Sequence, residues 1–277
     1  MNVFSVETGN FKLDGGAMFG VVPKVIWQKT NPADSYNFCN WAMRCMLIED
    51  GNRLILVDTG IGDKQHEKFF SHFHLNGDAT LEKSLANLGF HCNDITDVLI
   101  THLHFDHVGG AVKRAGEKFA LTFPNAKYWS NQKHWNWALQ PNAREKASFL
   151  SENILPIEEL GHLNFIKNGS ELGENIELLL VDGHTEQQMI PIVNYKGRKV
   201  AFCADLIPSV GHLKIPYIPS YDVRPLITMQ EKSFFLDKAI KENYVLFFEH
   251  DAYNECCDLK PGEKGINLGA KFKLSDL

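Results

Sequence analysis

The feature of this sequence that most constrains its fold is a set of short apolar runs, each ending at a residue able to bind a metal ion. The runs and their final residues are DVLIT (97–101) before His102, IELLLVD (176–182) before His184, VAFCA (200–204) before Asp205 and VLFFE (245–249) before His250. Apolar runs of this length are typical of buried strands. Because ligands of open α/β sheets gather outside the carboxyl ends of strands, we expect these residues to serve one site.

The segment THLHFDHVGG (101–110) carries the densest group of such residues. In extended backbone, alternate side chains share a side, so His102 and His104 can bind one ion. Asp106 and His107 follow as the chain turns, and we expect them to face a second ion. The two glycines that follow permit a tight backbone path into a helix and leave space beside it. The alternatives to a working metal site are a chance cluster on the surface and a purely structural metal site.

Adding the later residues gives five histidines and two aspartates, which are too many ligands for one tetrahedral ion. They suit two ions that share a carboxylate and keep an open position for water, as catalytic sites do. Imidazole and carboxylate without thiolate suit zinc first, with iron, manganese, cobalt or nickel as alternatives. The candidate ligands are His102, His104, Asp106, His107, His184, Asp205 and His250.

The rest of the chain predicts a mixed α/β (α+β) fold, in which strands come first and then alternate with helices. We expect one domain over residues 1–277, with no internal repeat. The expected strands are 21–27, 41–49, 53–58, 97–101, 176–182, 189–195, 199–205 and 244–250, and the expected helices are 79–90, 131–154 and 225–242.

Composition excludes several classes of protein. The net charge is −6 and no long basic run is present, so we expect no nucleic-acid partner. No apolar run approaches the roughly 20 residues that span a bilayer, and no export signal is visible, so we expect no membrane partner and a cytoplasmic protein. The six cysteines form no CxxC pair, which favours reduced thiols over disulfides.

Three further features have both a structural and a functional interpretation. Asp58 follows a strand and precedes Thr59, so it either caps a turn or orients a ligand histidine; we favour the orienting role. His72 and His74 form a second HxH, which we interpret as loop because no Asp-His pair follows. Cys203 lies on the strand that leads to Asp205 and is interpreted as a core thiol.

HxHxDH with downstream His, Asp and His, preceded by LVDTG (56–60), resembles the metallo-β-lactamase superfamily. The segments LDGGAMFGVVPKVIW (13–27), FPNAKYWSNQKHW (123–135), GHTEQQ (183–188) and ADLIPS (204–209) are similar to its quorum-quenching N-acyl homoserine lactonase branch, which borders the methyl parathion hydrolase-like enzymes. The resemblance implies a four-layer αββα sandwich. It also implies that His102, His104 and His184 hold one metal, that Asp106, His107 and His250 hold the other, and that Asp205 bridges.

The expected activity is hydrolysis of a lactone by a hydroxide held between two divalent ions, with Asp106 and Asp205 as catalytic residues. Alternatives are an organophosphate, aryl ester or thioester as substrate, or a metal-binding or diiron redox protein without hydrolase activity. Pro208 stands where one lactonase subgroup has a substrate-contacting tyrosine, and Tyr221 or Tyr217 is a candidate replacement. Expected pocket residues are Met18, Phe19, Phe105 and Tyr221, and the resemblance also suggests a homodimer.

Overall fold

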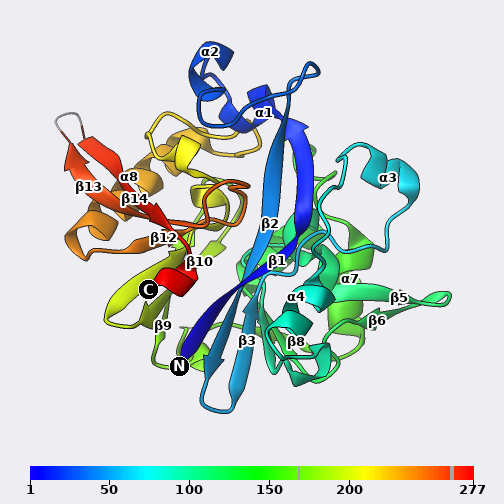
Figure 1. The fold of residues 1–277 in the computed structure, drawn as a ribbon. Coiled ribbons are helices and arrows are strands. Elements are labelled where there is room, and N and C mark those ends of the chain that lie inside the picture. The colour runs from blue at the N-terminus through cyan, green and yellow to red at the C-terminus, as the bar shows by residue number, and fades with distance from the viewer. Residues whose placement is uncertain (168, 263–264) are drawn as a thin grey trace. The chain divides into compact units, whose positions relative to one another are not determined.

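The computed structural model describes residues 1–167, 169–262 and 265–277, and it is a mixed α/β structure (Figure 1). The strands are β1 (Asn2–Asp14), β2 (Phe38–Asp50), β3 (Arg53–Val57), β4 (Asp97–Leu99), β5 (Val112–Ala115), β6 (Lys118–Leu121), β7 (Lys127–Ser130), β8 (Leu163–Phe165), β9 (Ile176–Val181), β10 (Gln188–Tyr195), β11 (Arg198–Phe202), β12 (Val245–Phe247), β13 (Cys256–Gly262) and β14 (Gly265–Phe272). The α-helices are α1 (Gly15–Phe19), α2 (Lys24–Trp27), α3 (Glu67–Ser71), α4 (Leu81–Asn87), α5 (Phe105–Val108), α6 (Gln132–Leu139), α7 (Ser151–Glu159) and α8 (Pro225–Lys241). The predicted fold class is therefore confirmed.

The strands form two six-stranded sheets and one hairpin. The first sheet has the order β1-β2-β3-β4-β7-β8, the second has the order β14-β13-β12-β11-β10-β9, and β5 pairs with β6. Contacts along the chain divide it into two compact units. The first unit comprises residues 1–9, 43–171 and 187–189, and the second comprises 10–42, 172–186 and 190–277. The expectation of a single domain stays a prediction.

Parallel strand pairing brings candidate ligands to one edge of each sheet. In the first unit β3 is parallel to β4, with Val57 opposite Leu99. In the second unit β11 is parallel to β12, with Phe202 opposite Phe247. Because parallel strands end at the same edge, the segments that follow β3 and β4 lie together, and so do the segments that follow β11 and β12.

Several local predictions, based on turn residues and helix ends, agree with the structure. The predicted hairpin at residues 50–53 joins β2 to β3, with Asp50 paired to Arg53. The helix predicted over 79–90 is α4, and the Thr80 hydroxyl accepts the Lys83 N–H as its N-cap. Gly89 follows this helix with φ of +86°, a left-handed conformation that glycine adopts without strain.

Other local predictions are wrong. Residues 21–27 do not form a strand. Pro23 is the N-cap of the short helix α2, and the apolar side chains of Val21 and Val25 are 90% and 67% exposed. The helical stretch predicted over 131–154 is two helices, α6 and α7, separated by a connection at 140–150. The N-terminal strand β1 was not predicted.

Each unit buries its own apolar core. In the first unit, side chains from the sheet, α4, α6 and α7 pack together, including Leu56, Leu85, Val98, Trp135 and Ile157. In the second unit the largest buried side chains include Trp27, Trp41, Phe202, Phe235 and Phe247. Burying such a side chain stabilises a fold by roughly 1.5–3 kcal/mol. Within the described residues, no helix is both long enough and apolar enough to cross a membrane.

Candidate metal centre

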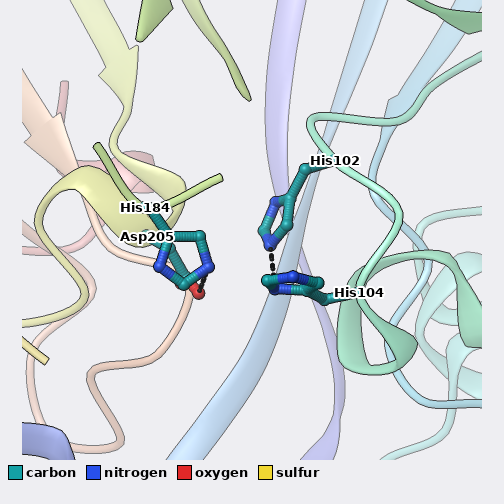
Figure 2. A group of neighbouring side chains, drawn as sticks. All are labelled: His102, His104, His184 and Asp205. Carbon is teal, nitrogen blue, oxygen red and sulfur yellow. Dashed lines mark hydrogen bonds and ion pairs between the residues drawn. The ribbon is translucent and has the colours of Figure 1, made fainter. Parts of the chain in front are cut away.

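The first group of candidate ligands lies where β4 ends and α5 begins. His102 and His104 occupy the connecting segment, and Asp106 and His107 lie within α5. All four side chains are buried or nearly so. Figure 2 shows the rings of His102 and His104 turned toward each other, with His102 Nε2 3.1 Å from His104 Nδ1. Asp106 Oδ1 lies 3.9 Å from His107 Nε2, so this segment presents two pairs of donors.

Asp58, which follows β3, contacts this group through His107. Its carboxylate accepts both the N–H and the hydroxyl of Thr101 at 2.7 Å, and one of its oxygens lies 3.0 Å from His107 Nδ1. Asp58 has a φ of +58°, a left-handed conformation that costs energy for a residue with a Cβ. The carboxylate is therefore fixed in place, and it makes the contact that orienting His107 requires.

The glycine pair after the motif is needed for close packing. A Cβ on Gly109 would lie 2.1 Å from the carbonyl oxygen of Ile61, and one on Gly110 would lie 2.2 Å from that of Thr59. Gly109 has a φ of −57°, which any residue can adopt, so the need for glycine here comes from the lack of space and not from the backbone conformation. The segment that follows β3 therefore fills the side of these glycines where a Cβ would lie, and the expectation that they leave space at the metal site stays a prediction.

The second group of candidate ligands lies in the second unit and is centred on Asp205. This residue follows β11, and its Oδ2 lies 3.0 Å from His184 Nε2, while its Oδ1 lies 2.9 Å from His250 Nε2. Figure 2 shows the contact with His184. The preceding Ala204 has a φ of +41°, a strained conformation at the turn out of β11. One carboxylate therefore offers a separate oxygen to each of two rings, as a shared ligand must.

In each of these two rings the outer nitrogen, which is the one that faces away from Asp205, also has a hydrogen-bond partner. His184 Nδ1 lies 2.8 Å from Asp222 Oδ1, and the hydroxyl of Thr228 donates to the other oxygen of Asp222 at 2.6 Å. His250 Nδ1 lies 2.8 Å from the carbonyl oxygen of Ala42. A carbonyl only accepts, so His250 carries a proton on Nδ1 and presents Nε2 as its ligand atom.

The carboxylates of the second group favour a positive charge at His184. Burial alone would lower the pKa of His184, but the carboxylates of Asp205 and Asp222 outweigh it and raise this pKa to about 10. The imidazole therefore holds a proton between two carboxylates when no other cation is present. A divalent ion would take over this role and release the proton.

The distances within each group also fit a metal ion. Zinc binds imidazole nitrogen and carboxylate oxygen at about 2.0–2.2 Å, so two ligand atoms on one tetrahedral ion lie roughly 3.3 Å apart. The ligand atoms of the pair His102–His104 lie 3.1 Å apart, and those of Asp205 lie 2.9–3.0 Å from the two rings it contacts. Donor type, burial and spacing in each group therefore suit divalent ions.

Of the expected pocket residues, the two on α1 are packed into the second unit. Met18 is 4% exposed and Phe19 is fully buried. The ring of Phe19 is stacked on Trp27 and on His212, with ring centroids 5.4 and 4.3 Å apart. His212 Nε2 lies 2.8 Å from the carbonyl oxygen of Met18, so this turn is held firmly.

The other two expected pocket residues are more accessible. Phe105 packs against Phe69 and Phe73 of the α3 region, with ring centroids 5.3 and 4.8 Å apart. Tyr221 is 41% exposed. A substrate pocket formed by all four expected residues stays a prediction.

Two other interpretations of single residues agree with the structure. Cys203 is fully buried, as expected of a core thiol, and burial raises its pKa well above the usual value. His72 and His74 are exposed residues at the end of α3 and beyond it.

Sequence reasoning missed residues that hold the candidate ligands or the backbone between them, and Asp222 and His134 are two of them. Asp222 lies just before α8, where an aspartate looks like an ordinary turn residue, yet it fixes His184 from 38 positions away. His134 lies on α6, and its Nε2 accepts the backbone N–H of Leu103, between the two histidines of HxH, at 2.8 Å. It stands beside Trp135 in a helix, where the sequence gives no sign of this contact. Neither contact leaves a local signal in the sequence.

Comparison with known proteins places this chain in a family. A model of the metallo-beta-lactamase superfamily matches residues 44–250. N-acyl homoserine lactonase from Bacillus thuringiensis is 24% identical over 229 residues, which cover 78% of this chain and 84% of the relative.

Solved structures of similar proteins have the same fold. A probable metal-dependent hydrolase from Staphylococcus aureus has a TM-score of 0.90 and 29% identity, covering 100% of this chain and 98% of its own. AidC, a dizinc quorum-quenching lactonase in complex with a product, has a TM-score of 0.80 and 22% identity, covering 98% and 95%. The predicted metallo-β-lactamase fold class is thus confirmed, and both groups of candidate ligands lie within the matched residues. The chain belongs to the metallo-beta-lactamase superfamily.

Proposed function

We propose that this protein is a dinuclear metal-dependent hydrolase that opens the ring of a lactone of the N-acyl homoserine type. The observation that carries the proposal is the carboxylate of Asp205, whose two oxygens face the Nε2 atoms of His184 and His250 at 3.0 and 2.9 Å. A carboxylate divided in this way between ligands from two strands is what a pair of ions requires of a bridging residue.

In this proposal the seven candidate ligands hold a pair of ions. His102, His104 and His184 hold the first ion, Asp106, His107 and His250 hold the second, and Asp205 belongs to both. Zinc is the first expectation, since the donors are imidazoles and carboxylates and the similar lactonase is dizinc. When bound, such ions lower the pKa of water and polarise a carbonyl.

The protein's own residues then orient the ligands and handle a proton. Asp58 and Asp222 hold the outer nitrogens of His107 and His184. Asp106 is the carboxylate proposed to take the proton that the attacking oxygen gives up and to pass it to the departing alkoxide oxygen, because ring opening leaves that oxygen in need of one.

The choice of a lactone rests on similarity and on the aromatic surface beside the ligands. The similar Bacillus thuringiensis protein is named as a lactonase. Phe105 directly precedes Asp106, and with Phe69 and Phe73 it forms an apolar cluster suited to an acyl chain. Tyr221 is proposed to replace the tyrosine absent at Pro208. We also retain the expectations of one domain, a homodimer and a cytoplasmic location.

The test combines metal analysis with a panel of substrates. The wild-type protein, Asp205→Asn and the control Asp237→Asn, an exposed aspartate of α8, are assayed for bound metal by mass spectrometry. Rates are measured with an acyl homoserine lactone, an organophosphate triester, a thioester and nitrocefin. We expect two ions per chain and the highest kcat/KM on the lactone for the wild type and the control.

Asp205→Asn should lose metal and, at a fixed metal concentration, lower kcat/KM by more than about 100-fold, because it removes a direct ligand whereas loss of an outer partner costs 10–100-fold. Full activity with full metal content in this variant would contradict the bridging role. A higher kcat/KM on the triester or thioester than on the lactone would leave the proposed metal centre standing but would change the proposed substrate. No hydrolysis of any of these by the metal-loaded protein would overturn the proposed function.

A further inference from the structure

Glu145 is a buried carboxylate that no part of the proposed function uses. It lies in the connection between α6 and α7 and is 2% exposed. Its Oε2 accepts the indole N–H of Trp137 at 2.8 Å and the side-chain amide of Asn142 at 2.5 Å. Its Oε1 lies 3.4 Å from Nε2 of His104. An ionised carboxylate is costly to bury unless a positive charge or hydrogen bonds compensate it.

The ring of His104 is turned the opposite way from the other candidate ligand rings. His107, His184 and His250 each direct Nδ1 outward, to an aspartate or a carbonyl oxygen. His104 instead directs Nδ1 toward His102 and Nε2 outward, toward Glu145. An ionised carboxylate can only accept a hydrogen bond. This contact therefore places the ring proton of His104 on Nε2 and makes Nδ1 the ligand atom.

We propose that Glu145 is a positioning residue for the metal centre, which holds His104 in the tautomer that ligates through Nδ1. This inference rests on the proposed function, because it requires an ion at His104. A carboxylate on the outer nitrogen of a ligand imidazole fixes the ring and increases its strength as a donor. Glu145 therefore raises the affinity for the ion that His104 binds.

The two oxygens of Glu145 separate this role from a purely structural one. Oε2 holds the α6–α7 connection through Trp137 and Asn142, and the backbone N–H of Glu145 adds a bond to Asn142 Oδ1 at 3.1 Å. A residue that only stabilised this connection would need no contact from Oε1 to a candidate ligand. The ring of Phe149 also packs on His104, with centroids 4.8 Å apart, so the imidazole is held by packing as well.

The experiment compares Glu145→Gln with Glu158→Gln, the same isosteric change at an exposed glutamate of α7. Zinc affinity is measured by competition with a chromophoric chelator, and the fold of the metal-free protein by circular dichroism. We expect Glu145→Gln to weaken binding of one of the two ions by about 10–100-fold. Its cobalt(II) form should show shifted visible bands, and the control should match the wild type in both measurements.

A double-mutant cycle with His104→Ala tests whether Glu145 acts through His104. We expect Glu145→Gln to have no further effect on zinc affinity once the imidazole is absent, whereas independent effects would overturn the inference. If Glu145→Gln does not fold, ¹⁵N shifts of the zinc-loaded wild type decide: a proton on Nε2 of His104 supports the inference, and one on Nδ1 overturns it. If the wild type binds no pair of ions, the proposed function itself fails. If it binds two and Glu145→Gln binds them equally well, only this inference fails.

Discussion

Replacing Lys232 by methionine removes a buried amine from the second unit while keeping a side chain of similar length. Lys232 lies on α8 and is 1% exposed. Its Nζ donates to the carbonyl oxygens of His212 and Tyr217, both at 2.8 Å. The lysine thereby ties the helix to the segment that follows Asp205 along the chain. The charge on this amine decides how the change affects stability at each pH.

Burial lowers the pKa of Lys232 from 10.5 to about 7, and the charge of Asp222 opposes this shift only in part. Between these two values the unfolded chain holds a proton that the native protein has lost. The free energy of unfolding therefore rises with pH in this window, by about 1.4 kcal/mol per pH unit. Below pH 7 both states hold the proton, and the native protein bears a cost of roughly 5 kcal/mol for the buried charge. Methionine does not titrate.

The assay is urea unfolding of both proteins at pH 7.5, 8.5 and 9.5, in one chelator-containing buffer, followed by tryptophan fluorescence. We expect the wild type to gain stability relative to Lys232→Met by about 1.4 kcal/mol for each pH unit. Lys238→Met is the control: this lysine lies on the same helix with its side chain 38% exposed, so its difference from the wild type should stay constant. A constant difference for Lys232→Met would refute the reasoning and show that the two carbonyls keep the amine charged.

Three further changes test other parts of the structure. Asp222→Asn should weaken zinc binding by about 10–100-fold in a chelator competition, because it removes the charge from the outer nitrogen of a ligand ring, and unchanged affinity would contradict that contact. Gly110→Ala should lower the free energy of unfolding by about 1–3 kcal/mol in urea, since the new Cβ would lie 2.2 Å from the oxygen of Thr59; an unchanged midpoint would show that the segment yields easily. Replacing His72 and His74 together by alanine should leave two ions bound per chain, because both side chains are exposed, and loss of an ion would place them at the metal centre.

The strands that lead to candidate ligands were predictable because their signals are local. The run 97–101 contains β4, 199–205 contains most of β11 and 244–250 contains β12. Each observed strand is shorter than its run, since the chain leaves the sheet before the ligand: β4 ends at Leu99, and His102 lies in the segment beyond. Apolar runs with few polar interruptions indicate burial on both faces, which parallel strands satisfy.

The same rule failed where an apolar run is not buried. Residues 21–27 have the composition of a strand, but Pro23 starts a helix there and Ile26 is 42% exposed. Strand β1 escaped prediction for the opposite reason: its burial pattern is mostly intermediate, and polar residues interrupt it. Its partner is β2 in the sheet, and pairing at that distance along the chain leaves no mark in either segment alone.

The candidate site divides in the same way between local and distant signals. The candidate ligands are visible because HxHxDH is compact and rare, whereas several of the groups on their outer nitrogens come from elsewhere in the chain. Asp58 is 49 positions from His107, and Glu145 is 41 positions from His104. Only Asp58 was found, because it follows a strand directly, as the ligands follow theirs. Orienting partners set metal affinity through one hydrogen bond each, so a single sequence can reveal which atoms bind a metal before it reveals how tightly they bind.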